Sequence, residues 1–221
     1  MNNTDGLFFK VYIEDIINFN DTLTDIDIAL YTYLSYSLFP ARDELFTSLA
    51  VLYKCIDMDI NKETDKDTIN KVKKSLIKLS SLELFEIEGE LKNRNSIFKI
   101  SNLQEGHYFA SVYIEDYKKL LKIEGINNNK LIRYYMTLLS TINSNYRVGW
   151  TTTNNLAHIT KLDIHTIHKF NSILEQNVLL YIKRDKAYLK DDMFISRFPN
   201  VYGRYRDKVK VRNFSYLSFA S

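Results

Sequence analysis

The sequence contains little cysteine, proline or glycine, and it has no long uncharged apolar run. A single cysteine, Cys55, excludes an internal disulfide and the cysteine-rich kinds of zinc site. Only 2 prolines and 6 glycines among 221 residues argue against long low-complexity segments. No run of about 18 uncharged apolar residues is present, so we expect no segment that crosses a membrane. The N-terminal stretch MNNTDGLFFK also lacks the basic and apolar regions of a secretory signal. We therefore expect a cytoplasmic protein without membrane contact.

Signatures of catalysis and of metal binding are missing as well. The sequence has no glycine-rich phosphate loop, no nucleophile elbow and no histidine pair of the kind that rolling-circle initiators need. His158, His165 and His168 lie close together, but Asp163 is the only acid near them and no cysteine accompanies them. A zinc site needs a fuller ligand set, so these histidines are better explained as facing solvent or DNA. We expect no enzymatic activity, no cofactor and no metal.

Two short strings occur twice, in the same order along the chain. VYIED stands at Val11–Asp15 and again at Val112–Asp116, and TINK at Thr68 is matched by TIHK at Thr166. The two offsets, 101 and 98 residues, are nearly equal, which indicates an internal duplication. The predicted divisions are a first domain at residues 1–104, a second domain at 105–190 and a basic aromatic tail at 191–221.

The alternating pattern of VYIED predicts a strand with its valine and isoleucine on one face. We expect each copy to pack on the helices of its own domain and to pair with the hairpin that follows them. A carboxylate pair for metal or acid–base chemistry is the less favoured alternative, because neither copy has a histidine or a third acid suitably placed beside it.

Hydrophobic spacing and capping residues predict the same order of elements in both domains. The first has a strand at 7–15, a helix from Asp21 or Thr24 to about Phe39, a helix at 43–58, a helix from near Asp67, and a hairpin turning at Lys92–Asn95. The second has a strand at 109–116, an added helix at 117–123, helices at 128–142, 151–162 and 163–176, and a hairpin turning at Arg184–Asp185. A helix, a helix-turn-helix and a hairpin form the order of a winged helix. We predict a mostly α fold with small β-hairpins, built from two tandem winged-helix domains.

Candidate DNA contacts are the polar residues that this pattern places outward on the second helix of each helix-turn-helix, at the start of the preceding helix in the second domain, on the wings and on the tail. In the second domain they are Thr152, Thr153, Asn154, His165, Thr166, His168, Lys169, Lys183 and Arg184. In the first domain and the tail they are Lys66, Thr68, Asn70, Lys71, Lys74, Lys92, Arg94, Arg204 and Arg206. A plain solvated helix face is the alternative interpretation of the same residues.

Charge is unevenly distributed along the chain. Residues 1–104 carry 12 Lys/Arg against 17 Asp/Glu, a net charge of −5, whereas residues 105–221 carry 18 against 10, a net charge of +8. A polyanion is held mainly by positive charge, so we expect the second domain to supply most of any DNA affinity. The tail interleaves tyrosine with arginine and suits contact with nucleic acid, but it would equally suit a contact with the acidic first domain.

Several segments resemble replication proteins of plasmids, phages and integrative elements of Gram-positive bacteria. They are FxxVYIEDYKKLL, NKLIRYYMTLLSTIN, TTTNNLAHITKLDIHTIHKFNSILEQ and NVYGRY. The likeness is to the winged-helix part of DnaD-like proteins and plasmid replication initiators, and it covers the second domain and the tail. Two tandem winged helices also resemble iteron-binding initiators, in which both modules grip DNA and one can also dimerise. No DnaD-type helicase-loading domain follows, which departs from that family.

The resemblance implies a sequence-specific duplex DNA-binding protein that acts as a replication initiator or origin-binding protein of a plasmid or phage. Its implied partners are double-stranded DNA, host replication proteins and a second copy in a homodimer. A transcriptional or copy-number regulator of the same element is one alternative. An adaptor whose winged helices bind protein is another, and the net negative charge of the first domain favours it.

Overall fold

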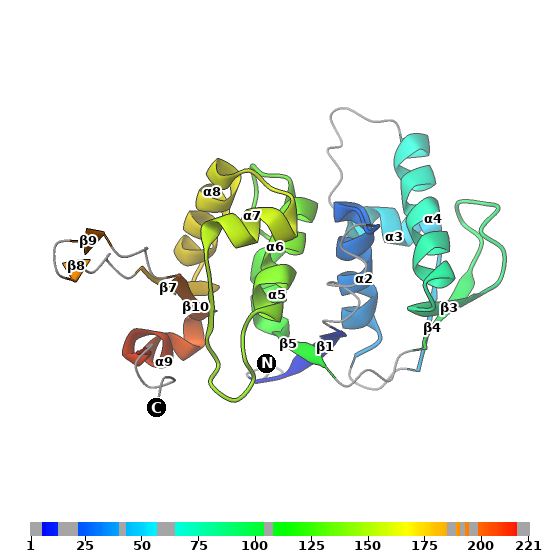
Figure 1. Cartoon of the computed structure of the whole chain (residues 1–221). Helices are drawn as coiled ribbons and strands as arrows, with labels where there is room; N and C mark the ends of the chain where they lie inside the picture. The colour runs from blue at the N-terminus through cyan, green and yellow to red at the C-terminus, as the bar shows by residue number, and fades with distance from the viewer. Residues whose placement is uncertain are drawn as a thin grey trace. The chain divides into compact units, whose positions relative to one another are not determined.

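The chain folds into helices and small antiparallel sheets that form two compact units. In the computed structural model the described residues are 6–12, 22–39, 43–56, 65–103, 108–184, 189–190, 193–194 and 199–215. Unit 1 comprises Met1–Met136 and unit 2 comprises Thr137–Ser221. The division along the chain therefore falls within residues 128–140, which form one helix, whereas the sequence places it after residue 104. Both units contain helices and short strands (Figure 1).

Unit 1 contains most of the described helices and two small sheets. Its elements are β1 (Phe8–Tyr12), α2 (Asp25–Ser37), β2 (Glu44–Thr47), α3 (Leu49–Cys55), α4 (Asp65–Ser81), β3 (Phe85–Glu88), β4 (Phe98–Asn102), β5 (Phe109–Tyr113), α5 (Ile114–Leu120) and the first part of α6 (Asn128–Ser140). β2, β4 and β3 form one antiparallel sheet in that order, and β1 pairs with β5 in a second sheet.

Helix α2 begins at a capping box. The Thr24 side chain accepts a hydrogen bond from the Asp27 backbone, and the Asp27 side chain accepts one from the Thr24 backbone. Asp25 adds a further negative charge at this positive end of the helix dipole. The prediction of a helix from Thr24 is therefore confirmed, and its core-facing residues include Ile28 and Leu34, both fully buried.

The prediction of a single helix over residues 43–58 is wrong in its first part. Glu44–Thr47 is a strand that pairs with β4, and α3 starts only after Ser48. Along β2 the exposed Phe46 is followed by the buried Thr47, which is the alternation of a strand. The apolar residues of 43–58 have helical spacing because the strand is followed directly by α3. Pairing of residues 44–47 with the distant strand β4 outweighs this local pattern. Residues 57–64 lie outside the described part of the chain.

The repeated strings lie side by side, but not in the way that the sequence predicts. β1 and β5 are antiparallel, with Phe9 opposite Val112 and Val11 opposite Ala110. The copies therefore pair with each other and not with the two hairpins. The second copy is a strand only as far as Tyr113, where α5 begins, so its last three residues are helical. Residues 13–15 of the first copy lie outside the described residues.

The elements of unit 2 continue from α6. They are β6 (Gly149–Thr151), α7 (Thr153–Thr160), α8 (Ile164–Gln176), β7 (Leu180–Lys183), β8 (Leu189–Lys190), β9 (Met193–Phe194), β10 (Asn200–Arg204), the 3-10 turn η1 (Tyr205–Asp207) and α9 (Lys208–Asn213). The sheet order is β6-β10-β7, and all its neighbouring pairs are antiparallel. β6 is a second short strand that the sequence does not predict.

The predicted hairpin at the end of the second domain is also corrected. β7 does not pair with the residues that follow Arg184; it pairs with β10, which the sequence assigns to the tail. β8 and β9 pair with each other as a separate ribbon. The tail is therefore part of unit 2, and α9 contacts both β7 and β10. Asp185, at the predicted turn, lies outside the described residues.

The same succession occurs twice along the chain. A helix is followed by a short strand, two helices and two further strands, first as α2-β2-α3-α4-β3-β4 and then as α6-β6-α7-α8-β7-β10, where the β8–β9 ribbon lies between β7 and β10 in the second case. In both sheets the last strand lies between the other two. The two three-stranded sheets therefore have the same strand topology, and they stand in place of the simple hairpins that the sequence predicts.

Candidate nucleic-acid interface

Local hydrogen bonds fix the start and end of α7. The Thr152 hydroxyl accepts a bond of 3.0 Å from the Asn155 backbone, and the Asn155 side chain donates to Thr151 Oγ1 at 2.9 Å. α7 ends at Lys161, whose φ of 55° places it in the left-handed region and turns the chain toward α8. Thr152 is exposed and is the N-cap, so the predicted contact residue also determines where the helix begins.

Asp163 caps α8. Its two carboxylate oxygens accept hydrogen bonds from the backbone and the hydroxyl of Thr166, at 2.8 and 2.6 Å. These bonds from Thr166 lower the pKa of Asp163 below its ordinary value, so the carboxylate is charged at neutral pH. Thr166 is half-buried and its hydroxyl proton is used in this cap, which leaves it less suited to a base contact than the sequence suggests.

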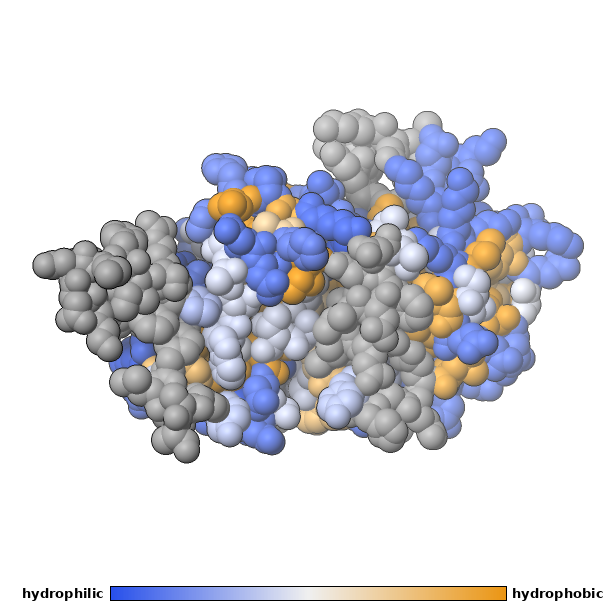
Figure 2. All heavy atoms as spheres, in the orientation of Figure 1, coloured by the Kyte–Doolittle hydropathy of each residue, from blue (hydrophilic) through white to orange (hydrophobic). Residues whose placement is uncertain are grey.

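One face of α8 is buried and the other is open. Ile167, Phe170 and Leu174 are buried, in the spacing of a helix that packs on its neighbour α7. The opposite face carries the exposed side chains of His165, His168, Lys169 and Ser172. Hydrophilic residues accordingly gather over α7 and α8 in Figure 2. Ile164, although apolar, is 47% exposed, because it lies one turn before the buried stripe begins.

The wing residues of unit 2 are tied to their own unit. Both terminal nitrogens of Arg184 donate to the Glu175 carboxylate, at 3.0 and 2.5 Å, and link the end of β7 to α8. Lys183 donates to the backbone oxygen of Phe214 at 2.7 Å. Arg184 stays exposed, so it could still meet a phosphate, but Lys183 is half-buried and serves first to hold the tail.

The two predicted tail contacts differ. Arg206 is exposed. Arg204 is only 8% exposed, so its assignment as an outward contact is corrected. Arg204 lies opposite Leu180 in the β10–β7 pair, and Leu180 is fully buried. Paired residues share a face of the sheet, so this register turns Arg204 inward.

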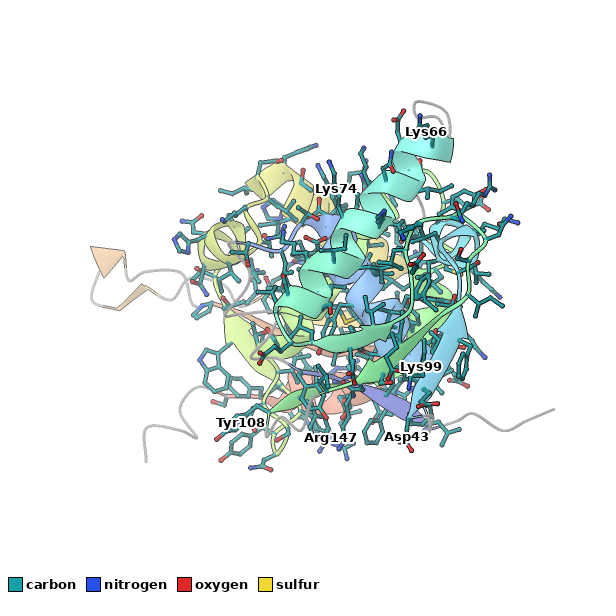
Figure 3. The ribbon with its side chains drawn as sticks, turned by 90° about the vertical axis from the view of Figure 1, so that its right-hand side faces the viewer. Asp43, Lys66, Lys74, Lys99, Tyr108 and Arg147 are labelled. Atoms are coloured by element: carbon teal, nitrogen blue, oxygen red, sulfur yellow. The ribbon has the colours of Figure 1, made fainter. Side chains whose placement is uncertain are left out.

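Helix α4 of unit 1 carries the matching set of cations. Lys66, Asn70, Lys71 and Lys74 are exposed, and Lys66 and Lys74 project from α4 in Figure 3. Thr68 is 6% exposed, so the prediction that it faces outward is wrong. It begins the buried stripe of α4, which then continues at helical spacing through Val72, Ser75, Leu76 and Leu79.

The predicted wing residues of unit 1 are exposed. Lys92 forms an ion pair of 2.9 Å with Glu90, and both side chains are mostly in water. Arg94 lies over the ring of Tyr53, 5.2 Å from its centre. An exposed ion pair of this kind contributes little to stability, so Lys92 could exchange Glu90 for a phosphate.

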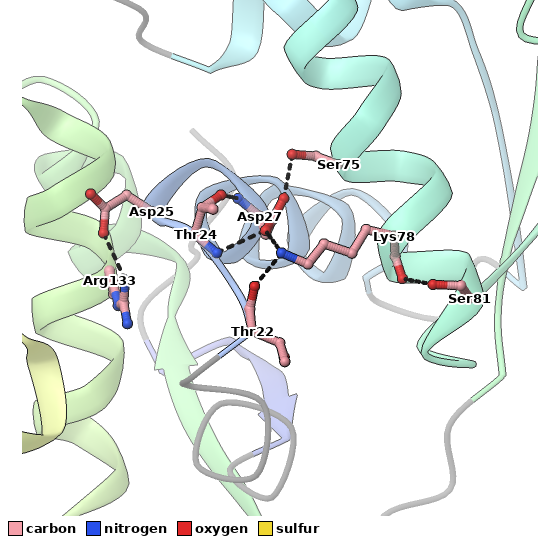
Figure 4. A network of polar contacts seen from close by, with 8 residues as sticks. All are labelled: Thr22, Thr24, Asp25, Asp27, Ser75, Lys78, Ser81 and Arg133. Atoms are coloured by element: carbon pink, nitrogen blue, oxygen red, sulfur yellow. Dashed lines mark hydrogen bonds and ion pairs between the residues drawn. The ribbon is translucent and has the colours of Figure 1, made fainter.

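A buried carboxylate positions α4, and the sequence analysis misses it. Asp27 of α2 is 2% exposed and accepts a 2.8 Å bond from Lys78 and a bond from the Ser75 hydroxyl, both on α4 (Figure 4). Lys78 also donates to the backbone oxygen of Thr22. The only sequence signal is an acid three residues after the N-cap Thr24, which explains the cap but not the link to α4.

The pH dependence of stability should reveal Asp27. Burial raises its pKa, but the hydrogen bonds from Lys78, Ser75 and Thr24 outweigh burial, so the folded-state pKa lies below the ordinary value of 3.8. A lowered folded pKa gives stability that is present above the unfolded pKa and is lost as pH falls through the folded pKa. We expect the stability difference between wild type and Asp27→Asn to be the same at pH 7 and pH 5 and to shrink below about pH 4. Urea unfolding of both proteins at each pH measures it, and a difference that grows on acidification would contradict the assignment.

The described residues contain neither a metal-binding cluster nor a membrane-spanning helix. No group of three or more His, Cys, Asp or Glu residues there could hold a metal ion. No helix there is long and apolar enough to cross a membrane.

Comparisons of the chain with protein-family models, with curated proteins and with solved structures gave no significant match. Function therefore has to be inferred from the two helix pairs α3–α4 and α7–α8 and from the charges that they expose.

Proposed function

We propose that this protein binds duplex DNA in a sequence-specific way through two tandem winged helices, as a replication initiator or origin-binding protein of a plasmid or phage. The observation that carries the proposal is the repeated order of helix, strand, two helices and two strands, with the same sheet order in both copies. In the winged-helix arrangement the second helix of the pair enters the major groove. That helix is α8 in the second copy and α4 in the first.

The exposed face of α8 has the chemistry for this role. His165, His168 and Lys169 offer donors for base edges and phosphates, and the buried residues of α8 hold that face outward. Two acids flank the face: Asp163 is engaged with Thr166, and Glu175 with Arg184. Neither adds an uncompensated charge in the middle of the helix, so α8 can approach a phosphate backbone.

Helix α4 is less favourable despite its lysines. Exposed Asp67 lies in its first turn, beside Lys66, and the surrounding residues 1–104 have a net charge of −5. Negative charges close to the helix repel phosphates and so offset the attraction of Lys71 and Lys74. We propose that unit 2 provides most of the duplex affinity and that unit 1 adds a weaker contact.

Binding-site selection from random duplexes, followed by titration of the selected duplex, tests the proposal. We expect Lys169→Ala to weaken binding by about 1–3 kcal/mol if it contacts a base edge, and Lys71→Ala to weaken it less. Affinity should also fall steeply as salt rises, because phosphate contacts release counterions.

Lys118→Ala is the matched control, because Lys118 is an exposed lysine on α5 outside both helix pairs. It should leave affinity unchanged at all salt concentrations. Failure to enrich any sequence, or a larger loss from Lys71→Ala than from Lys169→Ala, would contradict the assignment. Selected sites that repeat within an origin favour the initiator; a single site in a promoter favours a regulator.

A further inference from the structure

The two three-stranded sheets have equivalent outer faces. Phe46 and Trp150 each stand two residues before the N-cap of the following helix, in β2 and β6 respectively. Each is paired with the central strand of its sheet: Phe46 with Lys99, and Trp150 with Val201. Both aromatic side chains lie on the face opposite the buried threonine that comes next in the strand.

In unit 2 the tail covers this outer face. The ring of Trp150 stacks on Phe214, with 5.4 Å between the ring centres and 29° between the planes. Val201 is fully buried together with Val211 and Phe214. A Cβ added at Gly203 would collide with the side chain of Val211, which shows how closely α9 lies on β10.

In unit 1 the described residues leave the equivalent face open. Phe46 is 67% exposed and Ile97 is 73% exposed, at the edge of a hollow of about 490 Å³. Lys99 lies on this face, where it bonds Glu44 at 2.9 Å and Glu88 at 2.6 Å (Figure 3). Figure 2 shows apolar residues exposed among hydrophilic ones in this part of the molecule.

The charge of the open face is negative. Glu44, Glu86 and Glu88 alternate with inward residues along β2 and β3, so all three lie on the outer face with Lys99. The two bonds of Lys99 raise its pKa above the ordinary value, first through Glu88 and then through Glu44, so the lysine stays protonated. Three carboxylates against one ammonium leave an acidic rim around Phe46 and Ile97.

The outward face of α9 is the complement of this surface. Val211 fixes the inner side of α9 on its own sheet, while Val209 is 59% exposed. Lys210 and Arg212 are exposed beside it. One chain therefore carries a cationic patch with an apolar centre and an acidic patch with an apolar centre, which are complementary in both charge and hydrophobicity.

We propose that the outer sheet face of unit 1 binds the outward face of α9 from a second copy of this chain. Phe46 and Ile97 would cover Val209, and Glu86 with its neighbours would face Lys210 and Arg212. The two patches are different parts of the chain, so one copy uses its acidic face while its partner uses its cationic face. This self-association goes beyond DNA binding and does not depend on α8.

Charge reversal tests the contact with the full chain in the absence of DNA. Sedimentation equilibrium of the wild type should show association that rises with protein concentration and weakens as salt rises. Glu86→Lys and Lys210→Glu should each weaken association by about tenfold, because each replaces an attraction with a repulsion. An equal mixture of the two variants should regain association near the wild-type strength, since the reversed lysine and the reversed glutamate then meet.

Controls separate this contact from general charge effects and from misfolding. Glu124→Lys changes an exposed acid of unit 1 that lies outside the sheet, and it should associate like the wild type. Phe46→Ser should weaken association while circular dichroism stays unchanged, because the ring is already in water. A wild type that stays monomeric up to about 100 μM, or a mixture that is no stronger than either variant alone, overturns the proposal.

Discussion

Replacing Asp27 with alanine should lower the free energy of unfolding by about 3 kcal/mol, because it leaves Lys78 and Ser75 without their shared acceptor. Asp27 is 2% exposed and bonds residues of α4 that lie 48 and 51 positions away. The change also removes one half of the capping box of α2. The loss should be smaller than for a fully enclosed ion pair, since Lys78 is 33% exposed. Urea unfolding followed by circular dichroism measures it.

Two further variants make the test specific. Glu90→Gln also removes an acid from an ion pair with a lysine, but both partners are largely in water, so its effect should be below about 0.5 kcal/mol. In a double-mutant cycle, Asp27→Ala with Lys78→Ala should cost less than the sum of the single changes, because the two act on one interaction. An Asp27→Ala protein as stable as the Glu90→Gln protein would show that the network does not hold α4 to α2.

Replacing Gly149 with alanine should destabilise the protein by about 3 kcal/mol, in spite of the usual benefit of this change. A Gly-to-Ala change ordinarily adds about 0.4–1 kcal/mol through the unfolded chain. At Gly149, however, the new Cβ would lie 2.8 Å from the carbonyl carbon of Thr141 and closer still to its oxygen. These are backbone atoms that follow α6, so either this segment or β6 must move, and the clash outweighs the entropic gain.

Chemical denaturation compares this variant with Ser144→Ala, an exposed position between the same two elements, where the change should stay within about 0.5 kcal/mol. Because β6 leads directly into the Thr152 cap of α7, Gly149→Ala should also weaken duplex binding without removing any charge. Unchanged or increased stability of Gly149→Ala would mean that β6 approaches Thr141 less closely than described.

Helix starts could be predicted from the sequence because their causes are local. Thr24, Thr152 and Asp163 each cap a helix through a bond to a backbone group three residues ahead, and a pattern of a few residues contains all of that information. The core faces of α2 and α8 follow in the same way from the spacing of their apolar residues. The order of helices was therefore predictable without knowledge of their partners.

The two short strands β2 and β6 were not predictable, because their stability comes from distant partners. β2 and β6 have four and three residues and are held by β4 and β10 respectively, far along the chain. The strand that pairs with β7 is β10, and it comes after β8 and β9 in the sequence. The prediction instead paired β7 with the nearest downstream segment, which is wrong. Contacts of this range are decided by packing of whole elements and leave little trace in a local window.

The residues of the candidate interface could likewise be predicted only where their exposure follows from local spacing. The exposed lysines of α4 and the outward residues of α8 follow from helical spacing. Thr68 was assigned to the exposed face of α4 although it begins the buried one. Arg204 was assigned to an exposed tail because its strand pair with β7 was not recognised. Phe46 was hidden inside a predicted helix, so the open acidic face of the sheet could not be anticipated. Charge composition alone indicated which half of the chain is basic.

The pairing of β1 with β5 has a consequence for the order in which the protein forms. Phe8 and Tyr113 are partners, although they lie 105 residues apart, so this sheet joins the beginning of unit 1 to a segment near its end. Closing so long a loop is slow, and it cannot start during synthesis until β5 has been made. Until then Phe9 and Val11, which are buried in the folded protein, lie in a segment that has no partner strand. A nascent chain therefore exposes the apolar residues of β1 until the ribosome has translated residues 109–113, and a mispaired or aggregated chain is the failure expected during that interval.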